Sequence, residues 1–263
     1  MILKMVDMKN KYEKKYRKLL LSCLKNGIER DDRTGVGSYS VFNLSLKFKV
    51  DKYFPVLTGR RMFEKTFNTE FNWFINGETN IKRFQENNVK IWDNWANENG
   101  ELGPVYGYQM LNYNGENLNQ LQNVIDSINN KPDSRRHIIS LWNPLQINEM
   151  ALPPCYLYFQ FFVSKGNLNL FVLQRSGDLF LGIPYDSALF TMILLYVANK
   201  TGLKASKVEF NIIDAHIYKN QLDAVNEYLN SQIFDLPDYT FINNRINLIN
   251  YNHGKVITSK IAI

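Results

Sequence analysis

Hydrophobic positions along the chain follow two periods. A helical period predicts helices over residues 9–27, 62–76, 118–130 and 220–229, and the most apolar segment predicts a buried central helix over 186–202. Alternation predicts strands over 41–50 and 207–218, a strand after Arg136, and strand-like runs near 239–249 and 255–262. Without an internal repeat or a long linker, this mixture predicts one α/β domain over residues 1–263, a large mixed sheet packed by helices.

The stretch from Leu152 to Ala188 contains the densest candidate chemistry. LPPCY leads into an apolar strand, a second strand ends in QRSGD, and LGIPYDSA follows. Strands of this length fold back on one another, so we expect Cys155, Arg175 with Ser176, and Asp186 to meet at one pocket. A thiol, a guanidinium and a carboxylate together indicate covalent chemistry on a molecule that carries a phosphate.

Composition and charge narrow the class of protein. Of the 263 residues 45% are hydrophobic and 14% aromatic, which excludes a disordered chain. The longest apolar run is broken by Thr191 and too short to span a bilayer, and the N-terminus lacks a signal-peptide core, so we expect a cytoplasmic protein. Two cysteines, Cys23 and Cys155, are too few for a disulfide framework, and we expect Cys23 in the core. The three histidines do not have the spacing of zinc ligands. The scattered net charge of +6 favours a small anionic substrate over nucleic acid.

The helix over residues 62–76 contains a carboxylate among aromatic side chains. Its predicted core stripe is Phe63, Phe67, Phe71 and Phe74, and Glu70 lies among them. Surface carboxylates are commoner, but an inward-facing Glu70 would be desolvated. Burial would then raise its pKa and suit it to proton transfer.

Three other features have both a structural and a functional interpretation. Trp92 and Trp95 are explained by core packing, although they could also form a wall for a flat ring. A lone histidine at a strand end, such as His216, is usually structural. Arg135 and Arg136 enter a strand side by side and therefore point to opposite faces, so at a subunit boundary either could reach a phosphate.

The chain contains eight motifs of one known family. The motifs are DRTGVGS, EFNWFINGETNI, IWDNWA, GPVYG, PDSRRHIIS, LPPCY, QRSGDLFLGIPYDSA and DAHIY. Their order and spacing resemble those of the thymidylate synthase family, and the resemblance extends from about Lys11 to Ile263. The resemblance implies a thymidylate synthase-like fold with a large twisted mixed sheet, and a homodimer whose sheets pack back to back. It also implies methylenetetrahydrofolate as co-substrate, a pyrimidine deoxynucleoside monophosphate as substrate, and no metal.

The resemblance also implies roles for individual residues. Cys155 matches the nucleophile that adds to carbon 6 of the pyrimidine, Glu70 the acid that manages proton transfers, and Tyr106 a tyrosine near the nucleophile. The matches for the substrate site are Arg33, Gln174, Arg175, Ser176, Asp186, His216 and Tyr218, with Arg135 and Arg136 donated by the partner subunit. The matches for the folate site are Trp92, Asp178, Leu181, Gly182 and Ile263, the last in a tail that closes over the bound pair.

The implied chemistry sets a condition on the nucleophile. Carbon 5 of a pyrimidine is a poor nucleophile until a thiolate adds at carbon 6. We therefore expect a lowered pKa for Cys155, with Arg175 favouring the thiolate.

Two residues depart from the family pattern. Where thymidylate synthases have Pro-Cys-His and Pro-Phe-Asn, this chain has Cys155-Tyr156 and Tyr185-Asp186. The family asparagine offers a donor and an acceptor to uracil, whereas an ionised aspartate only accepts, which suits the amino group of cytosine. An aspartate here is also the pattern of the family's deoxycytidylate hydroxymethylases. A protonated or merely structural Asp186 would still admit uracil. The family histidine at the position of Tyr156 belongs to the polar network around oxygen 4 of the base, so its replacement fits a changed base edge and leaves the proton relay undecided.

The sequence therefore favours a folate-dependent deoxycytidylate hydroxymethylase, as in a phage that modifies its DNA, working in the cytoplasm of a bacterial or phage-infected cell. Three related activities stay open: thymidylate synthase, dUMP hydroxymethylase and dCMP methylase. A different class of protein also stays open, namely an inactive homologue that binds nucleotide or RNA. Whether hydride or water completes the reaction is not decided by the sequence.

Overall fold

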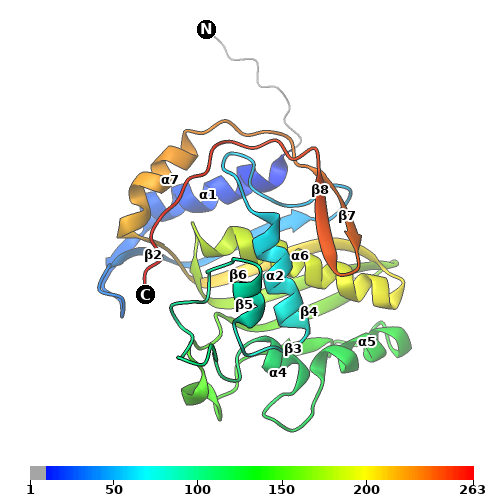
Figure 1. Cartoon of the computed structure of the whole chain (residues 1–263). Helices are drawn as coiled ribbons and strands as arrows, with labels where there is room; N and C mark the ends of the chain where they lie inside the picture. The colour runs from blue at the N-terminus through cyan, green and yellow to red at the C-terminus, as the bar shows by residue number, and fades with distance from the viewer. Residues whose placement is uncertain (1–9) are drawn as a thin grey trace.

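A six-stranded mixed sheet forms the centre of the computed structural model, which describes residues 10–263 (Figure 1). The first position of the helix predicted over 9–27, and most of the N-terminus expected to lack a signal peptide, lie outside the described residues. Across the sheet the strands are β1 (Ile28–Arg30), β2 (Ser38–Lys49), β6 (Lys204–Tyr218), β5 (Asn167–Asp178), β4 (Tyr156–Ser164) and β3 (Ile138–Ser140). Neighbours pair antiparallel except β5 and β6, which are parallel. The mixed sheet packed by helices is thus confirmed.

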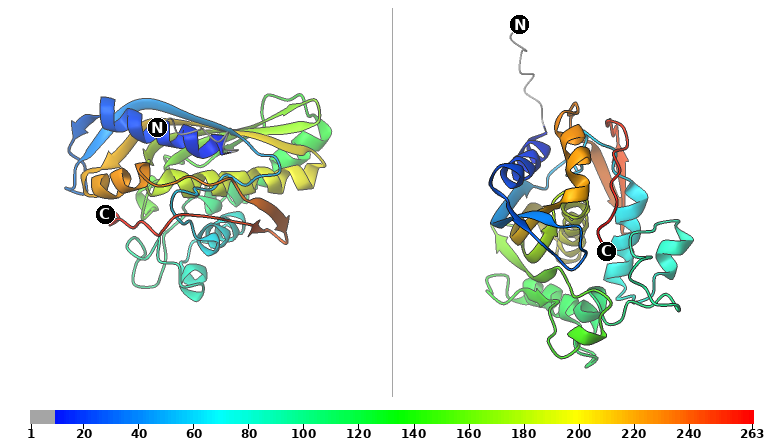
Figure 2. Two further views of the ribbon diagram at one scale, coloured as in Figure 1. Left: turned by 90° about the horizontal axis from the view of Figure 1, so that it is seen from above. Right: turned by 90° about the vertical axis from the view of Figure 1, so that its left-hand side faces the viewer.

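Helices cover one face of this sheet. They are α1 (Lys11–Asn26), α5 (Gln120–Asn130) and α6 (Gly182–Thr201). The ring of Tyr12 in α1 meets Phe48 of β2 edge-on at 5.0 Å, and Phe190 of α6 meets Phe159 and Phe210 at 5.3 and 5.6 Å between centroids. Figure 2 shows α6 against the sheet and α2 (Glu64–Ile75) beyond it. The opposite face carries partly exposed side chains.

The central helix α6 is buried nearly all round, as its apolar sequence predicts. It begins at Gly182, four residues before the predicted start, and ends at Thr201. The capping residue Gly202 has a φ of 66°, a left-handed conformation that glycine adopts without strain. Just before the helix, the carboxylate of Asp178 accepts the N–H groups of Phe180 and Leu181. This side chain therefore fixes the turn between β5 and α6.

The remaining elements are α3 (Lys82–Glu86), α4 (Gly107–Leu111), the 3-10 turns η1 (Ile147–Glu149) and η2 (Lys219–Gln221), α7 (Leu222–Leu229), β7 (Asp238–Ile242) and β8 (Arg245–Ile249). Of these, α3, α4 and β8 contact α2, whereas α7 packs against α1. The single strand-like run predicted near 239–249 is wrong, since β7 and β8 form a hairpin. Asn243 and Asn244, with φ of 51° and 58°, make its turn.

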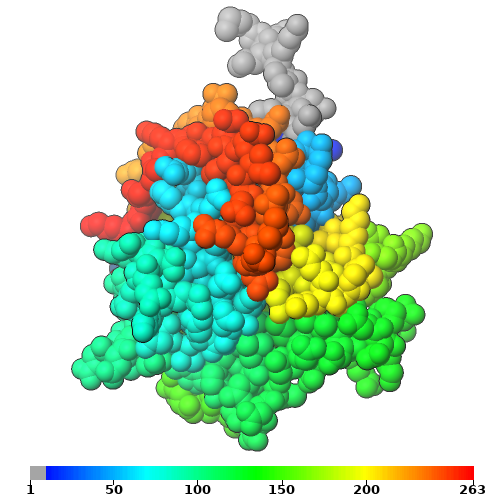
Figure 3. All heavy atoms as spheres, turned by 45° about the vertical axis from the view of Figure 1, so that its right-hand side comes forward, coloured from blue at the N-terminus to red at the C-terminus, as the bar shows by residue number. Residues whose placement is uncertain are grey.

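Two further predictions fail at the surface. Phe63 is 41% exposed at the start of α2 and does not belong to the core stripe. Residues 255–262 form no strand. This tail runs over the surface beside the segments near residues 60–90 (Figure 3), and is held where Gly254 donates to the Thr58 carbonyl and Arg61 donates to the Lys255 carbonyl. These contacts are not β-sheet pairings, so the apolar residues of the tail pack on the surface of the protein and do not form a strand.

A β-bulge interrupts the start of β4. Tyr158 pairs with Leu173, but Tyr156 pairs with Gln174, so two steps along β4 match one step along β5. The extra residue is Leu157, whose carbonyl oxygen accepts hydrogen bonds from the backbone N–H groups of Leu141 and Trp142. The bulge turns Tyr156 to the helix-covered face, where it is buried, whereas Tyr158 lies on the opposite face.

No helix within residues 10–263 has the length and apolar character that a membrane crossing requires.

Candidate active site

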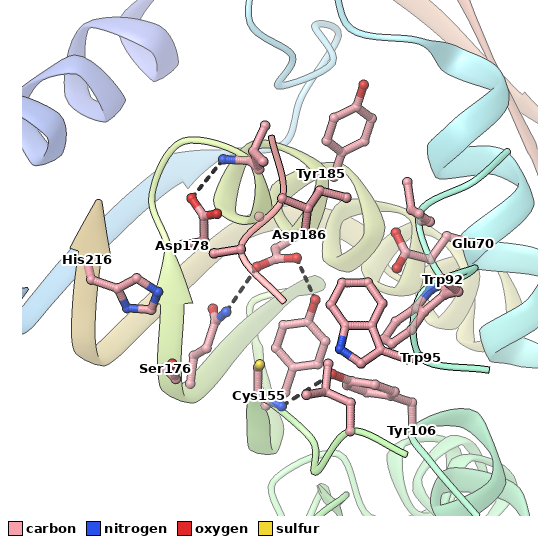
Figure 4. Close-up of a pocket in the computed structure, with 18 of the residues that line it drawn as sticks. Glu70, Trp92, Trp95, Tyr106, Cys155, Ser176, Asp178, Tyr185, Asp186 and His216 are labelled. Atoms are coloured by element: carbon pink, nitrogen blue, oxygen red, sulfur yellow. Dashed lines mark hydrogen bonds between the residues drawn. The ribbon is translucent and has the colours of Figure 1, made fainter. Parts of the chain in front are cut away.

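A cavity of about 310 Å³ lies at the edge of the sheet where β4 begins and β5 ends (Figure 4). This volume is within the range of small-molecule sites. All but three of the site residues predicted from the sequence line it, namely Arg33, Glu70, Trp92, Tyr106, Cys155, Gln174, Arg175, Ser176, Asp178, Leu181, Gly182, Asp186, His216 and Tyr218. The hairpin of β4 and β5 and the start of α6 thus converge as expected.

Three predicted residues lie elsewhere in the described chain. Arg135 and Arg136 are exposed in the turn before β3, so their placement in a strand is wrong, since β3 starts at Ile138. Their reach into a partner subunit stays a prediction. Ile263 is 53% exposed, and the tail residues that line the cavity are Ile261 and Ala262. The expected tail contact is therefore made one and two positions earlier.

The turn that carries Cys155 is anchored by Arg175. The guanidinium donates from Nε to the Pro154 carbonyl at 2.9 Å and from Nη2 to the Pro153 carbonyl at 2.8 Å. The backbone N–H of Arg175 donates to the Cys155 carbonyl at 2.8 Å. Arg175 also lies over the Trp142 ring, 5.6 Å from its centroid. The thiol therefore sits on a turn held by a fixed positive charge.

The acidity of Cys155 differs from the expectation. Burial raises the pKa of the thiol and outweighs the Arg175 guanidinium, which favours the thiolate as predicted; the Asp186 charge raises the pKa further. Tyr106 and Arg33 act with Arg175 in lowering it. The expected lowered pKa is thus wrong.

Tyr106 reaches the cavity through an uncommon backbone conformation. Its φ of 36° is positive, and its hydroxyl accepts the Cys155 N–H at 3.4 Å. A Cβ at the next residue, Gly107, would lie 2.2 Å from the carbonyl oxygen of Phe74. Only glycine therefore allows α4 to approach α2 this closely, and this approach places Tyr106 beside the thiol.

Glu70 faces the cavity from α2, so its side chain points inward and not to the outer surface of the helix. Burial and the charge of Asp186 raise its pKa to about 8, while the indole of Trp92 acts in the opposite direction. A carboxyl with this pKa exchanges a proton near neutral pH.

Asp186 lies in the first turn of α6 and is 8% exposed. One carboxylate oxygen accepts the Tyr156 hydroxyl at 2.5 Å, and the other accepts Nε2 of Gln174 at 3.0 Å. Burial raises the pKa of Asp186 to about 6, although both hydrogen bonds lower it. The two hydrogen bonds therefore favour the ionised carboxyl, and burial opposes it.

At the other end of the cavity, His216 lies against Tyr218, with ring centroids 4.9 Å apart. Burial acts to lower the pKa of His216, but Asp214 and Asp178 outweigh burial and raise it. Asp178 in turn accepts Nε2 of Gln221 at 2.7 Å. His216 is thus a cavity residue with an ion-pair partner.

An aromatic wall closes the side next to Glu70. Trp92 meets Trp95 edge-on at 5.7 Å and Tyr106 at 5.6 Å. Both tryptophans line the cavity. The pair therefore packs with the core and also forms a wall of the cavity.

A family model described as thymidylate synthase matches residues 14–263. The chain belongs to the thymidylate synthase family. Members of this family transfer a one-carbon unit to a pyrimidine nucleotide, use methylenetetrahydrofolate as co-substrate, and are usually dimeric. Within residues 10–263, no three His, Cys, Asp or Glu side chains are grouped as a metal site.

Thymidylate synthase motifs located the polar side of this site but missed much of its apolar lining. Residues that line the cavity without an assigned site role are Thr66, Ile91, Trp95, Leu152, Tyr156, Tyr185, Ile261 and Ala262. Most are apolar residues in loops or the tail, and nothing in their sequence context distinguishes them from core residues. The Tyr156 contact to Asp186 was also missed, although both positions had been noted as departures from the family.

Proposed function

We propose that this protein is a deoxycytidylate hydroxymethylase, which converts dCMP, methylenetetrahydrofolate and water into 5-hydroxymethyl-dCMP and tetrahydrofolate. The observation that supports this choice is the carboxyl of Asp186, which is buried in the same cavity as Cys155 and accepts hydrogen bonds from Tyr156 and Gln174 that favour its ionised form. A carboxylate accepts hydrogen bonds and cannot donate one.

The preference for cytosine follows from the edge of the base. The exocyclic amino group of cytosine donates a hydrogen bond, so it satisfies an acceptor. Uracil presents an oxygen at the same position, which would face the carboxylate of Asp186 without a proton between them. A buried polar mismatch costs about 1–3 kcal/mol and more when a charge is involved. Sites built on such pairs discriminate by up to about 10⁴-fold.

The reaction assigns a role to three side chains. Cys155 adds as a thiolate to carbon 6 of the pyrimidine, which makes carbon 5 nucleophilic. Carbon 5 then bonds to the methylene carbon of the folate, the hydrogen on carbon 5 leaves as a proton, and tetrahydrofolate departs. Water adds to the resulting exocyclic methylene, and the sulfur leaves carbon 6. Glu70, with its pKa of about 8, exchanges the protons, and Tyr106 orients the nucleophile.

Water, and not hydride, completes the proposed reaction. A methyl product requires a hydride from tetrahydrofolate and leaves dihydrofolate, whereas addition of water involves no oxidation or reduction. The choice of water rests on the resemblance to hydroxymethylases that carry aspartate at the position of Asp186. The carboxyls of Glu70 and Asp186 both line the cavity and offer acceptors that would orient this water.

The remaining side chains position the two substrates. We propose that Arg33, Arg175 and Ser176 bind the phosphate, that His216 and Tyr218 bind the sugar, and that Gln174 assists at the base. Folate would lie against Trp92, Asp178, Leu181 and Gly182 under the tail that ends at Ile263. In the proposed homodimer the exposed sheet faces pack together, and Arg135 and Arg136 reach the phosphate of the partner. One catalytic domain would thus work on free nucleotides in the cytoplasm of a bacterial or phage-infected cell.

The test is direct incubation of the protein with methylenetetrahydrofolate and either dCMP or dUMP. We expect 5-hydroxymethyl-dCMP by mass spectrometry, without the absorbance increase of dihydrofolate. Turnover of dUMP alone would overturn the preference for cytosine, and a stoichiometric rise of dihydrofolate would overturn addition of water. Failure to release tritium from carbon 5 of either nucleotide would identify an inactive nucleotide-binding homologue.

A further inference from the structure

The two departures from the family pattern touch each other in this structure. We propose that Tyr156 is a specificity-determining residue, whose phenol, together with Gln174, holds the Asp186 carboxyl as a hydrogen-bond acceptor and thereby selects a pyrimidine with an exocyclic amino group. This inference rests on the proposed contact between Asp186 and the base. It gives Tyr156, which the sequence marks only as a replacement of the family histidine, a positioning role.

Each oxygen of the Asp186 carboxyl has its own protein donor. Tyr156 donates to one oxygen at 2.5 Å, a length typical of a hydroxyl bound to a carboxylate, and Gln174 donates to the other at 3.0 Å. Figure 4 shows the two dashed lines that meet at Asp186. The carboxyl is thus held at both ends, and its orientation toward the cavity is fixed.

The donor residues are neighbours across the β4–β5 hairpin. Tyr156 and Gln174 are directly paired in the register, and they are 7% and 2% exposed. The Tyr156 ring is packed edge-on against Phe190 at 4.7 Å and against Tyr106 at 5.5 Å. Because the ring is held on both sides, the hydroxyl keeps its direction when the cavity is empty.

Two neutral donors on one carboxyl favour its ionised form, because a carboxylate accepts both bonds more strongly than a protonated carboxyl does. To contact uracil, the carboxyl would have to carry a proton and donate it to the uracil oxygen. The hydroxyl of Tyr156 opposes that protonation, since it hydrogen-bonds the charged form. Removing the hydroxyl therefore makes an Asp186 that tolerates uracil more readily.

Gln174 provides an internal check on this account. Its Oε1 atom is buried and has no hydrogen-bond partner among the described residues, because Nε2 is turned toward Asp186. An asparagine at position 186 would present an NH₂ group, and a flipped Gln174 amide would accept from it. The present orientation of Gln174 therefore fits a carboxylate at position 186.

Several other titratable groups act on Asp186 and have to be considered in a pH experiment. They are Asp178 of β5, Glu70 of α2, Cys155 before β4, Tyr106 at the start of α4 and Tyr12 of α1. All of them stay in place when only the Tyr156 hydroxyl is removed. The change in pH profile between two variants therefore isolates the phenol.

The test is the ratio of kcat/KM for dCMP to that for dUMP in Tyr156→Phe. This variant keeps the ring and removes the hydroxyl. A hydrogen bond to a charged group corresponds to about a 10- to 100-fold effect, so we expect the ratio to fall by at least about tenfold. The acid limb of kcat/KM for dCMP should move to higher pH, because Asp186 loses a donor that lowers its pKa. Tyr239→Phe is the control, since it also loses a phenol hydrogen bond, to the Asp51 carbonyl, away from the cavity.

A double-mutant cycle separates positioning from general packing. In an Asp186→Asn background there is no carboxylate to hold, so Tyr156→Phe should change the ratio less than twofold there. A merely structural role would produce the same change in both backgrounds, and so would overturn the proposal. If Tyr156→Phe does not fold, Gln174→Met removes the second donor at similar length, and the same fall in the ratio is expected.

The outcomes distinguish this inference from the proposed function. A wild-type protein that prefers dUMP contradicts the proposed function itself. A wild type that prefers dCMP, with a Tyr156→Phe ratio and acid limb like those of the wild type, contradicts only the role of Tyr156.

Discussion

The raised pKa of Glu70 makes the stability of the folded protein dependent on pH. Its ordinary pKa is 4.5, and burial with the charge of Asp186 raises it to about 8 in the folded state. As pH rises above 4.5, the unfolded chain releases this proton while the folded protein keeps it. Stability from this group is therefore fully present below pH 4.5 and is lost as pH rises to about 8.

The size of the loss follows from the two pKa values. Each pKa unit corresponds to about 1.4 kcal/mol, so the shift of Glu70 corresponds to at most about 5 kcal/mol. Partial contact of the carboxyl with solvent and its coupling to Asp186 reduce this to about 2–4 kcal/mol. Replacing Glu70 by glutamine removes the titration. The free energy of unfolding of Glu70→Gln should therefore fall about 2–4 kcal/mol less than that of the wild type between pH 5 and 8.

The assay is urea unfolding of the ligand-free protein at a series of pH values. Protein concentration is kept fixed, because members of the family are usually dimeric and association contributes to stability. Asp186→Asn is the informative companion, since the pKa of Asp186 is raised from 3.8 to about 6. In that variant the free energy of unfolding should depend less on pH in the lower part of the range. The pH at which Glu70 loses its proton should also fall, because a neighbouring negative charge is gone. A Glu70→Gln protein that loses stability as steeply as the wild type above pH 6 would refute the reasoning.

Three further substitutions test the site and the core. Cys155→Ala should abolish tritium release from carbon 5 and still bind nucleotide in calorimetry; any measurable turnover would contradict its role as nucleophile. Arg175→Lys should slow alkylation of Cys155 by iodoacetamide and lower kcat/KM at least about tenfold, because one ammonium cannot hold both carbonyls that the guanidinium bonds; unchanged alkylation would contradict the anchoring role. Glu13→Gln should lower the free energy of unfolding by about 3 kcal/mol or more, since the buried carboxylate accepts from Asn10, Thr58, Gly59 and Tyr228 and an amide would turn an NH₂ toward some of these donors.

The sequence alone was sufficient to predict which reactive and charged side chains meet at the cavity. Cys155 and Arg175 were expected together because they end the two strands of one hairpin, and the structure pairs those strands. The sequence did not decide whether Glu70 faces the cavity or the solvent, because an aromatic stripe on a helix does not specify the direction of the carboxylate beside it. Its direction depends on the packing of α2 against α6, which involves residues more than 100 positions later.

The errors arose where the structure depends on contacts that a local pattern does not contain. Residues 255–262 alternate like a strand, yet Ile257 and Ala262 are buried by packing on the surface of the protein without a partner strand. The pKa of Cys155 was expected to be low from its arginine neighbour, but burial has the larger effect. Both cases require knowledge of the surroundings in three dimensions.

The bulge at Leu157 means that chain length, and not only residue identity, determines what this site recognises. In a regular ladder that included Leu157, Tyr156 and Tyr158 would share one side of β4. One residue inserted in β5 between Leu173 and Gln174 would give Leu157 a partner and restore that regular pairing. The phenol would then leave the nucleotide side of the sheet, with every functional residue still present in the sequence. Engineering libraries that vary only side chains would not sample this determinant.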